Sequence, residues 1–270
     1  MKLINTGDPQ IKPSVVMMVY GEGGVGKTTF ASTAPKPLLL DFENGSKYFG
    51  MRGIKVDVAL VESWEDIRNP EFLKVLKDEK FETIIIDPIG EAMDKLKTNL
   101  VNSGQSKFVQ ASTGDLTMAG WGELKKRMRN FVKSLRDSGK NVIIVAHIEE
   151  KDDEGRLVKR PKVETKLSEE LVNMVDIVAY MTVTKGNEDD EDKRILIVDP
   201  TSDKIVAKDR TGRLGKYIEP DFSKIVNACQ GTKTYEWSKE VVKDEPKEEA
   251  PSKAKTVQDK LEKAKVEDGK

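Results

Sequence analysis

Residues 15–29 read VVMMVYGEGGVGKTT, and this stretch decides how the rest of the chain is interpreted. Residues 15–20 form a continuous apolar run of strand length. Residues 21–28 then match the pattern G-x-x-x-x-G-K-[ST] in full. Glycines let backbone N–H groups turn inward around a phosphate, and the helix expected to follow adds its partial positive charge. We therefore expect a phosphate-binding loop between a buried strand and a helix.

Two residues of the loop have specific expected roles. Lys27 should reach the β- and γ-phosphates of ATP, and the Thr28 hydroxyl should bind Mg²⁺. The alternative is a glycine-rich turn that holds no ligand. The expected ATP-binding residues are Gly21, Glu22, Gly23, Gly24, Val25, Gly26, Lys27, Thr28 and Thr29.

Asp87 is the expected second half of the site. It follows three isoleucines at the carboxyl end of a predicted buried strand, residues 81–87. Ligands of open α/β sheets bind at that end. Asp87 is therefore expected to hold Mg²⁺ together with Thr28, through water. A helix N-cap role is the alternative, because Pro88 can be a first helical residue, and the two roles are compatible.

Strands and helices are expected to alternate along the first part of the chain. Strands are predicted over residues 37–41, 56–61, 81–87, 141–146, 176–184, 194–199 and 205–209. Helices are predicted over residues 27–34, 63–77, 89–102 and 118–138, with Ser63 as an N-cap and a polar loop over 103–115. This order predicts an α/β fold with a mostly parallel sheet flanked by helices and hairpin-connected strands near its C-terminal edge.

Composition limits the class of protein. The chain has 270 residues and a formal net charge of −1, which excludes a histone-like basic binder. One cysteine excludes an intrachain disulfide and a cysteine-based metal cluster. No apolar run approaches the roughly 18 residues of a membrane span, and the N-terminus lacks the apolar stretch of a signal peptide. We expect a cytoplasmic protein without a membrane partner.

Two regions differ in composition. Residues 239–270 contain nine lysines, nine acidic residues and no aromatic residue. Such a segment cannot bury enough apolar surface to offset its ordering entropy. We expect one domain over residues 1–238 and a charged, disordered tail over residues 239–270.

Other nucleotide-binding classes fit less well. Glu22 stands where partition ATPases need a signature lysine, and no asparagine is followed by lysine as the guanine-reading motif N-K-x-D requires. No loop singles out the arginine-bearing lid of a small-molecule kinase.

Residues 41–43, Asp-Phe-Glu at the end of the second predicted strand, resemble the RecA-type ATPases, in which a glutamate at that place activates the attacking water. Over about residues 14–220 the chain resembles the core-only RecA-like ATPases of bacteriophages, grouped with single-strand annealing and recombination proteins. It departs from bacterial RecA in having only about 14 residues before the first strand, too few for the oligomerising helical arm.

The resemblance implies an Mg²⁺-dependent ATPase that binds single-stranded DNA in phage recombination or replication, within the bacterial host cytoplasm. It also implies a homo-oligomer, ring or filament, with ATP at subunit interfaces, and a single-stranded-DNA-binding protein as a further partner. The alternatives are an ATPase that acts as a loader or motor on another protein, and a nucleotide-gated scaffold with negligible hydrolysis.

Two further catalytic residues follow from the resemblance. Glu43 lies 16 residues after Lys27, beside the first strand if the two strands neighbour, where a carboxylate could orient water toward a γ-phosphate. Its alternative role is to stabilise the turn at Asn44. His147 is expected to end a strand at the same sheet edge as Asp87, where RecA-like proteins place a γ-phosphate sensor, often glutamine. Its alternative role is a hydrogen bond to a backbone carbonyl.

Two loops are candidates for DNA contact. Residues 155–167 carry a charge of +4, which could bind phosphates with a salt-sensitive affinity, or could be an ordinary solvated hairpin. The expected contacts there are Arg156, Lys159, Arg160 and Lys162. In residues 103–115, Lys107 and Phe108 could bind a strand, with a base stacked on the aromatic ring.

Lys208 and Arg210 are expected on the same side of a late strand, because side chains alternate. Two like charges on one face indicate an anion between them. RecA-like proteins use a similar pair on the γ-phosphate of a neighbouring subunit's ATP. The alternative is an edge strand protected by charge.

Overall fold

The computed structural model describes residues 13–153, 155–184, 192–199 and 204–231. The predicted tail over residues 239–270 lies outside these residues, as do both ends of the predicted domain.

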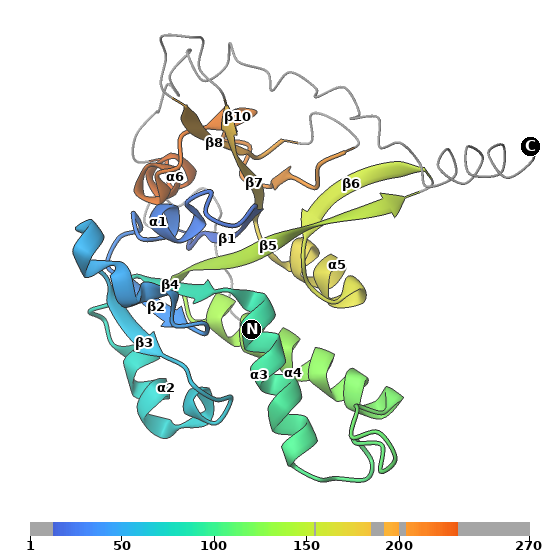
Figure 1. The fold of residues 1–270 in the computed structure, drawn as a ribbon. Helices are drawn as coiled ribbons and strands as arrows, with labels where there is room; N and C mark the ends of the chain where they lie inside the picture. The colour runs from blue at the N-terminus through green and yellow to red at the C-terminus, as the bar shows by residue number, and fades with distance from the viewer. Residues whose placement is uncertain (1–12, 154, 185–191, 200–203, 232–270) are drawn as a thin grey trace, which may run out of the picture.

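One sheet organises the described chain (Figure 1). Its order is β10-β8-β7-β1-β5-β4-β2-β3, with β6 paired to β5 and β9 to β7. The strands are β1 Val16–Gly21, β2 Pro37–Asp41, β3 Asp57–Leu60, β4 Thr83–Asp87, β5 Asn141–Asp153, β6 Arg156–Pro161, β7 Ile177–Thr184, β8 Lys193–Ile197, β9 Lys208–Asp209 and β10 Tyr217–Ile218. The strands from β7 to β3 along this order are parallel, and β6, β8, β9 and β10 pair antiparallel.

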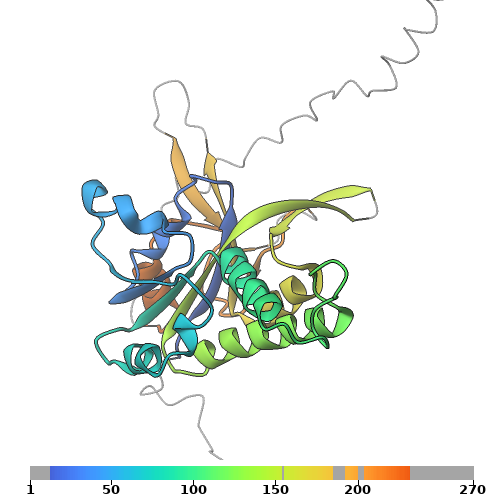
Figure 2. The ribbon, with the colours of Figure 1, turned by 60° about the horizontal axis from the view of Figure 1, so that its bottom comes forward.

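Helices cover both faces of the sheet (Figures 1 and 2). They are α1 Lys27–Ala31, α2 Pro70–Lys77, α3 Ile89–Asn102, α4 Met118–Arg136, α5 Thr165–Met174 and α6 Phe222–Cys229, with short 3-10 turns η1 Gly45–Tyr48, η2 Gly50–Arg52 and η3 Asp66–Arg68. Helices α3, α4 and α5 pack on one face, and α1 and α6 pack on the other.

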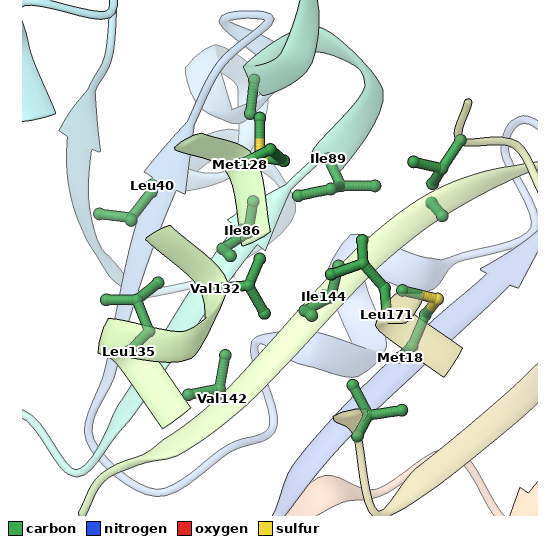
Figure 3. Packing of buried hydrophobic residues seen from close by; sticks show 14 of the residues in the cluster. Met18, Leu40, Ile86, Ile89, Met128, Val132, Leu135, Val142, Ile144 and Leu171 are labelled. Atoms are coloured by element: carbon green, nitrogen blue, oxygen red, sulfur yellow. The ribbon is translucent and has the colours of Figure 1, made fainter. Parts of the chain in front are cut away.

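The central strands are apolar throughout because both their faces are buried. In β1, Met18 joins the core under α4 and α5, whereas Met17 joins the core under α1 and α6. Figure 3 shows Val132 of α4 and Leu171 of α5 packed over Ile144. A continuous apolar run such as residues 15–20 therefore marks a strand at the centre of the sheet.

The expected fold class is confirmed: the sheet is mostly parallel, flanked by helices, with antiparallel strands toward its C-terminal part. The helix over residues 89–102 is confirmed with its bounds. The N-cap expected at Ser63 is wrong. The helix begins at Pro70, where Asn69 accepts a hydrogen bond from the Glu71 N–H at 2.9 Å and proline occupies the first turn.

The second half of the chain departs further from expectation. The predicted strand over 141–146 continues to Asp153 and forms a hairpin with β6. Helices α5 and α6 and the strand β10 were not predicted, and the strand over 205–209 shrinks to Lys208–Asp209. These segments are short, so local periodicity carries little signal and tertiary packing decides their structure.

None of the helices in the described residues is both long enough and apolar enough to cross a membrane.

Candidate functional site

A cavity of about 190 Å³ lies at the carboxyl ends of the parallel strands. It brings together the phosphate loop, the segment after β2, the end of β4 and the middle of β5. Its lining residues are Gly23, Gly24, Gly26, Lys27, Thr28, Thr29, Leu39, Asp41, Glu43, Gly45, Ser46, Phe49, Arg52, Asp87, Val145 and His147.

The loop is shaped around the Lys27 side chain. Lys27 is the first residue of α1, and its Nζ donates hydrogen bonds to the Gly21 carbonyl at 2.8 Å and the Glu22 carbonyl at 2.7 Å. The side chain is only 7% exposed. Gly26 has φ 105°, a left-handed conformation that side chains rarely adopt. The loop therefore holds a cation at its centre.

Burial and nearby carboxylates have opposite effects on the pKa of the Lys27 ammonium. Burial lowers the pKa of the Lys27 ammonium. The negative charges of Asp87, Glu22 and Glu43 raise the same pKa and oppose that effect. A phosphate entering the cavity would add the anionic partner that this buried lysine favours.

Asp87 and Thr28 meet across the cavity floor. Burial is the main reason that the pKa of the Asp87 carboxyl is raised to about 6, and the negative charges of Glu43 and Asp41 contribute to the rise. The hydrogen bond from the Thr28 side chain acts in the opposite direction and lowers this pKa. A hydroxyl and a carboxylate held together are the hard oxygen ligands that Mg²⁺ takes, so these two residues fit the ion.

The alternative N-cap role of Asp87 does not hold. Helix α3 begins at Ile89, its N-cap position is Pro88, and no side chain caps it.

Glu43 reaches the cavity from β2, but not in the way its sequence position indicated. The strands β5 and β4 separate β2 from β1, so the two strands are not neighbours. Asp41, at the end of β2, is buried and folds the next residues back over the sheet edge. Its carboxylate accepts hydrogen bonds from the backbone N–H groups of Glu43 at 3.1 Å, Gly45 at 3.2 Å and Ser46 at 2.9 Å.

His147 lines the cavity from β5, the strand next to the one that leads into the loop. It pairs in register with Gly21, the first residue of the phosphate loop. The strand does not end there as expected, because β5 continues for six more residues to Asp153. The His147 carbonyl accepts a hydrogen bond from the Lys162 N–H at 2.8 Å, at the base of the β5–β6 hairpin.

Among the charged residues that line the cavity, sequence reasoning missed two, Asp41 and Arg52. Asp41 could have been found from its position after a buried strand and before the turn signal at Asn44. Arg52 carried no such signal. Its Nη2 lies 3.4 Å from the Thr29 hydroxyl, so its guanidinium stands beside the first turn of α1.

In the fold, acidic residues of the paired strand offset the positive charge of the first DNA candidate, residues 155–167. Residues 156–161 pair with a strand rich in acids, and residues 147–162 together carry five cationic and five acidic side chains. The cross-strand pairs are Glu149 with Arg160, Glu150 with Lys159 and Asp153 with Arg156. The +4 count was right for one strand and missed its partner.

Arg160 in particular is an unsuitable phosphate contact. Its side chain is 13% exposed, and its Nε lies 2.8 Å from the Glu149 carboxylate. The contact is an ion pair whose angle is not that of a hydrogen bond. Lys159 lies 3.9 Å from the Glu150 carboxylate and over the Tyr180 ring. Lys162 follows the strand and is exposed.

The second DNA candidate is also changed by packing. Phe108 is half-buried and packs against the core, and the Lys107 Nζ lies over its ring at 5.7 Å from the centroid. A stacked base would have to displace these contacts.

Lys208 and Arg210 lie on one side as expected, but the group between them is a helix end. The Lys208 Nζ donates to the carbonyls of Val172, Asn173 and Val175, at 2.8, 3.3 and 2.7 Å. Arg210 donates to the same Asn173 carbonyl at 3.0 Å. The C-terminal end of α5 supplies the negative charge, so the pair needs no anion.

A complete phosphate loop joined to Thr28 and Asp87 at the carboxyl ends of a parallel sheet defines a P-loop nucleotide-binding domain. A family model described as "AAA domain" matches residues 14–211, and the chain belongs to that family.

The chain also resembles individual proteins. The SPbeta prophage-derived uncharacterized protein YorG of Bacillus subtilis (strain 168) is 28% identical over 185 residues, which cover 67% of this chain and 54% of that protein. This chain thus spans about half the length of that relative.

Two solved structures are similar at low identity. The KaiC-like protein PH0186 from Pyrococcus horikoshii OT3 is 13% identical with a TM-score of 0.38, covering 68% of this chain and 78% of its own. The flagellar accessory protein FlaH from Methanocaldococcus jannaschii is 11% identical with a TM-score of 0.40, covering 77% and 85%.

Proposed function

We propose that this protein is a RecA-like, Mg²⁺-dependent ATPase. One observation carries the proposal: a single cavity joins the complete phosphate loop to the carboxylates of Asp87, at the end of β4, and Glu43, in the turn after β2. A phosphate-binding turn alone would need neither carboxylate.

The residues divide the chemistry between them. Lys27 and the loop N–H groups bind the phosphates, and Glu43 orients the attacking water and accepts its proton. His147, from the strand beside the phosphate loop, donates a hydrogen bond to the γ-phosphate. Thr28 and Asp87 would hold Mg²⁺, which neutralises charge on the β- and γ-phosphates.

The test is steady-state release of phosphate from ATP, with Mg²⁺ and with excess EDTA. Wild type should turn over ATP only with Mg²⁺. Lys27→Ala should be inactive, whereas Lys126→Ala, an exposed surface lysine of α4, should match wild type. Wild type that binds ATP without turning it over would instead support the nucleotide-gated scaffold.

We further propose that the nucleotide cycle is coupled to single-stranded DNA, in phage recombination or replication. The support is a continuous strand: β5 passes from His147 in the cavity directly into the hairpin with β6, which projects from the sheet in Figure 1. Similarity to a prophage-derived protein supports the phage setting. Turnover should rise when single-stranded DNA is added. A rise only with another protein would favour the loader or motor.

A further inference from the structure

The phosphate loop is held from its outer side by a residue of a distant strand. Arg194 lies in β8, and its Nε donates a hydrogen bond to the Val25 carbonyl at 3.0 Å, 169 positions earlier in the chain. Its side chain also lies against Gly26, where an added Cβ would stand 3.2 Å from Nε and 3.3 Å from Cδ. Arg194 therefore contacts two consecutive loop residues.

The position of Arg194 in its strand explains this reach. Side chains alternate along β8, so Arg194 shares a face with Leu196. Leu196 packs in the core cluster that also contains Phe30 of α1. The loop that begins α1 lies on the same side of the sheet.

The contact fixes the orientation of one peptide group. The Val25 carbonyl and the Gly26 N–H belong to the same peptide, and it is trans, since the cis bond among the described residues joins Asp87 and Pro88. In a trans peptide the C=O and N–H bonds point in opposite directions. A carbonyl held toward Arg194 therefore directs the Gly26 N–H away from it, toward the cavity that Gly26 lines.

The charged guanidinium of Arg194 does more than fix the orientation of the Val25–Gly26 peptide. Hydrogen bonds from a guanidinium are stronger than those from neutral donors. A donor on the carbonyl also polarises the peptide, which makes its N–H a better donor to an anion on the other side.

We propose that Arg194 is a positioning residue of the nucleotide site, which aims the Gly26 N–H at the β-phosphate of a bound nucleotide. This inference rests on the proposed nucleotide binding and extends the site to β8. It separates nucleotides by phosphate number: ADP and ATP carry the group that the peptide recognises, and AMP does not.

The test compares three variants by calorimetric titration with Mg-ADP, Mg-ATP and AMP, alongside thermal melting without nucleotide. Arg194→Met keeps an unbranched side chain against Gly26 and removes the donor. Arg194→Lys restores a cationic donor. Arg68→Met removes an arginine that is 60% exposed in η3 and distant from the loop in sequence.

The expected result is selective. Arg194→Met should bind Mg-ADP and Mg-ATP at least about 10-fold more weakly, by a similar factor for both, because a charged hydrogen bond is lost. AMP binding should not change, Arg194→Lys should recover part of the loss, and Arg68→Met should match wild type. In steady state, the loss should appear in KM more than in kcat. If Arg194→Met does not fold, Arg194→Gln takes its place with the same expectation.

Two results would overturn the inference, and they differ. If wild type binds Mg-ADP and the Arg194→Met variant binds it equally well, Arg194 has no positioning role, even if the melting temperature falls. If wild type binds neither Mg-ADP nor Mg-ATP, the proposed function fails and this inference fails with it.

Discussion

At the scale of single residues, the site depends on Asp41, a buried acid that lines the cavity and also holds the turn beside it. Asp41 accepts three backbone hydrogen bonds from the turn that carries Glu43. The turn is held as well by the Phe42 N–H, which donates to the Asp87 carbonyl at 3.0 Å, but only the Asp41 contacts bind the Glu43 N–H among the hydrogen bonds described. The role of Asp41 is therefore to place Glu43, which lies two residues further along.

Asp41→Asn should lower kcat about 10-fold while leaving Mg-ATP affinity within about twofold, because charge-assisted bonds to the turn weaken and Glu43 becomes less well placed. Stopped-flow binding and steady-state turnover measure the two effects separately. Asp57→Asn, at an exposed ion pair of β3, is the matched control. Lost binding with normal kcat would place Asp41 in nucleotide contact instead.

At the scale of elements, β9 and the end of α5 stabilise the fold at a place where the sequence predicted a catalytic pair of cations. Lys208 of β9 binds three carbonyls at the end of α5, and burial lowers the pKa of its ammonium, followed by the positive charge of Arg210. The pairing stabilises the junction between α5 and β7.

Lys208→Met should lower the free energy of unfolding by about 1–2 kcal/mol, since the helix end loses its cationic donor. Turnover per folded molecule should be unchanged. Urea unfolding and an activity assay on the same preparation check this. A fully stable but inactive variant would return Lys208 to a catalytic role.

The β5–β6 hairpin is the element that tests DNA contact. Because the Arg160 side chain is mostly buried, the useful variant is Arg156→Gln combined with Lys162→Gln. If each residue contacts one phosphate of single-stranded DNA, the salt dependence of binding should flatten by roughly 1.4 in log–log slope.

The control for the hairpin is a pair of exposed α4 lysines, Lys126→Gln with Lys133→Gln, which should leave the slope unchanged. An unchanged slope in the hairpin variant, with binding intact, would move the DNA contact elsewhere on the molecule.

Local patterns predicted the part of the site that neighbouring residues determine. The strand, glycine loop and helix at residues 15–31, and Asp87 after its isoleucines, are each readable within one short window. The cross-strand acids that neutralise the hairpin cations, the Asp41 turn and the Arg194 contact depend on residues brought together by the sheet. The pair of Arg194 and Val25, for example, is separated by 169 positions, and no local periodicity reports it.

At the scale of the whole molecule, we propose a homo-oligomer with ATP at its subunit interfaces, and variants of Arg210 can test this. Its side chain is 57% exposed and lies 3.8 Å from Asp176, so it could still reach a neighbouring subunit. If ATP lies at an interface, specific activity should rise with protein concentration. Inactive Arg210→Ala mixed with inactive Glu43→Gln should then regain activity, because some interfaces combine both intact residues.

The result that would contradict this trans role is a mixture as inactive as each parent after subunit exchange has been confirmed. Arg210 would then act only within its own chain, at the end of α5.

The central claim is that one cavity both binds ATP and hydrolyses it through Glu43. The most direct measurement follows bound ATP and released ADP in the same single-turnover reaction, for wild type, Lys27→Ala and Glu43→Gln. Wild type should bind and convert ATP, Lys27→Ala should do neither, and Glu43→Gln should bind ATP but convert it at least about 100-fold more slowly, because an amide cannot accept the proton. Conversion by Glu43→Gln at the wild-type rate would contradict the account.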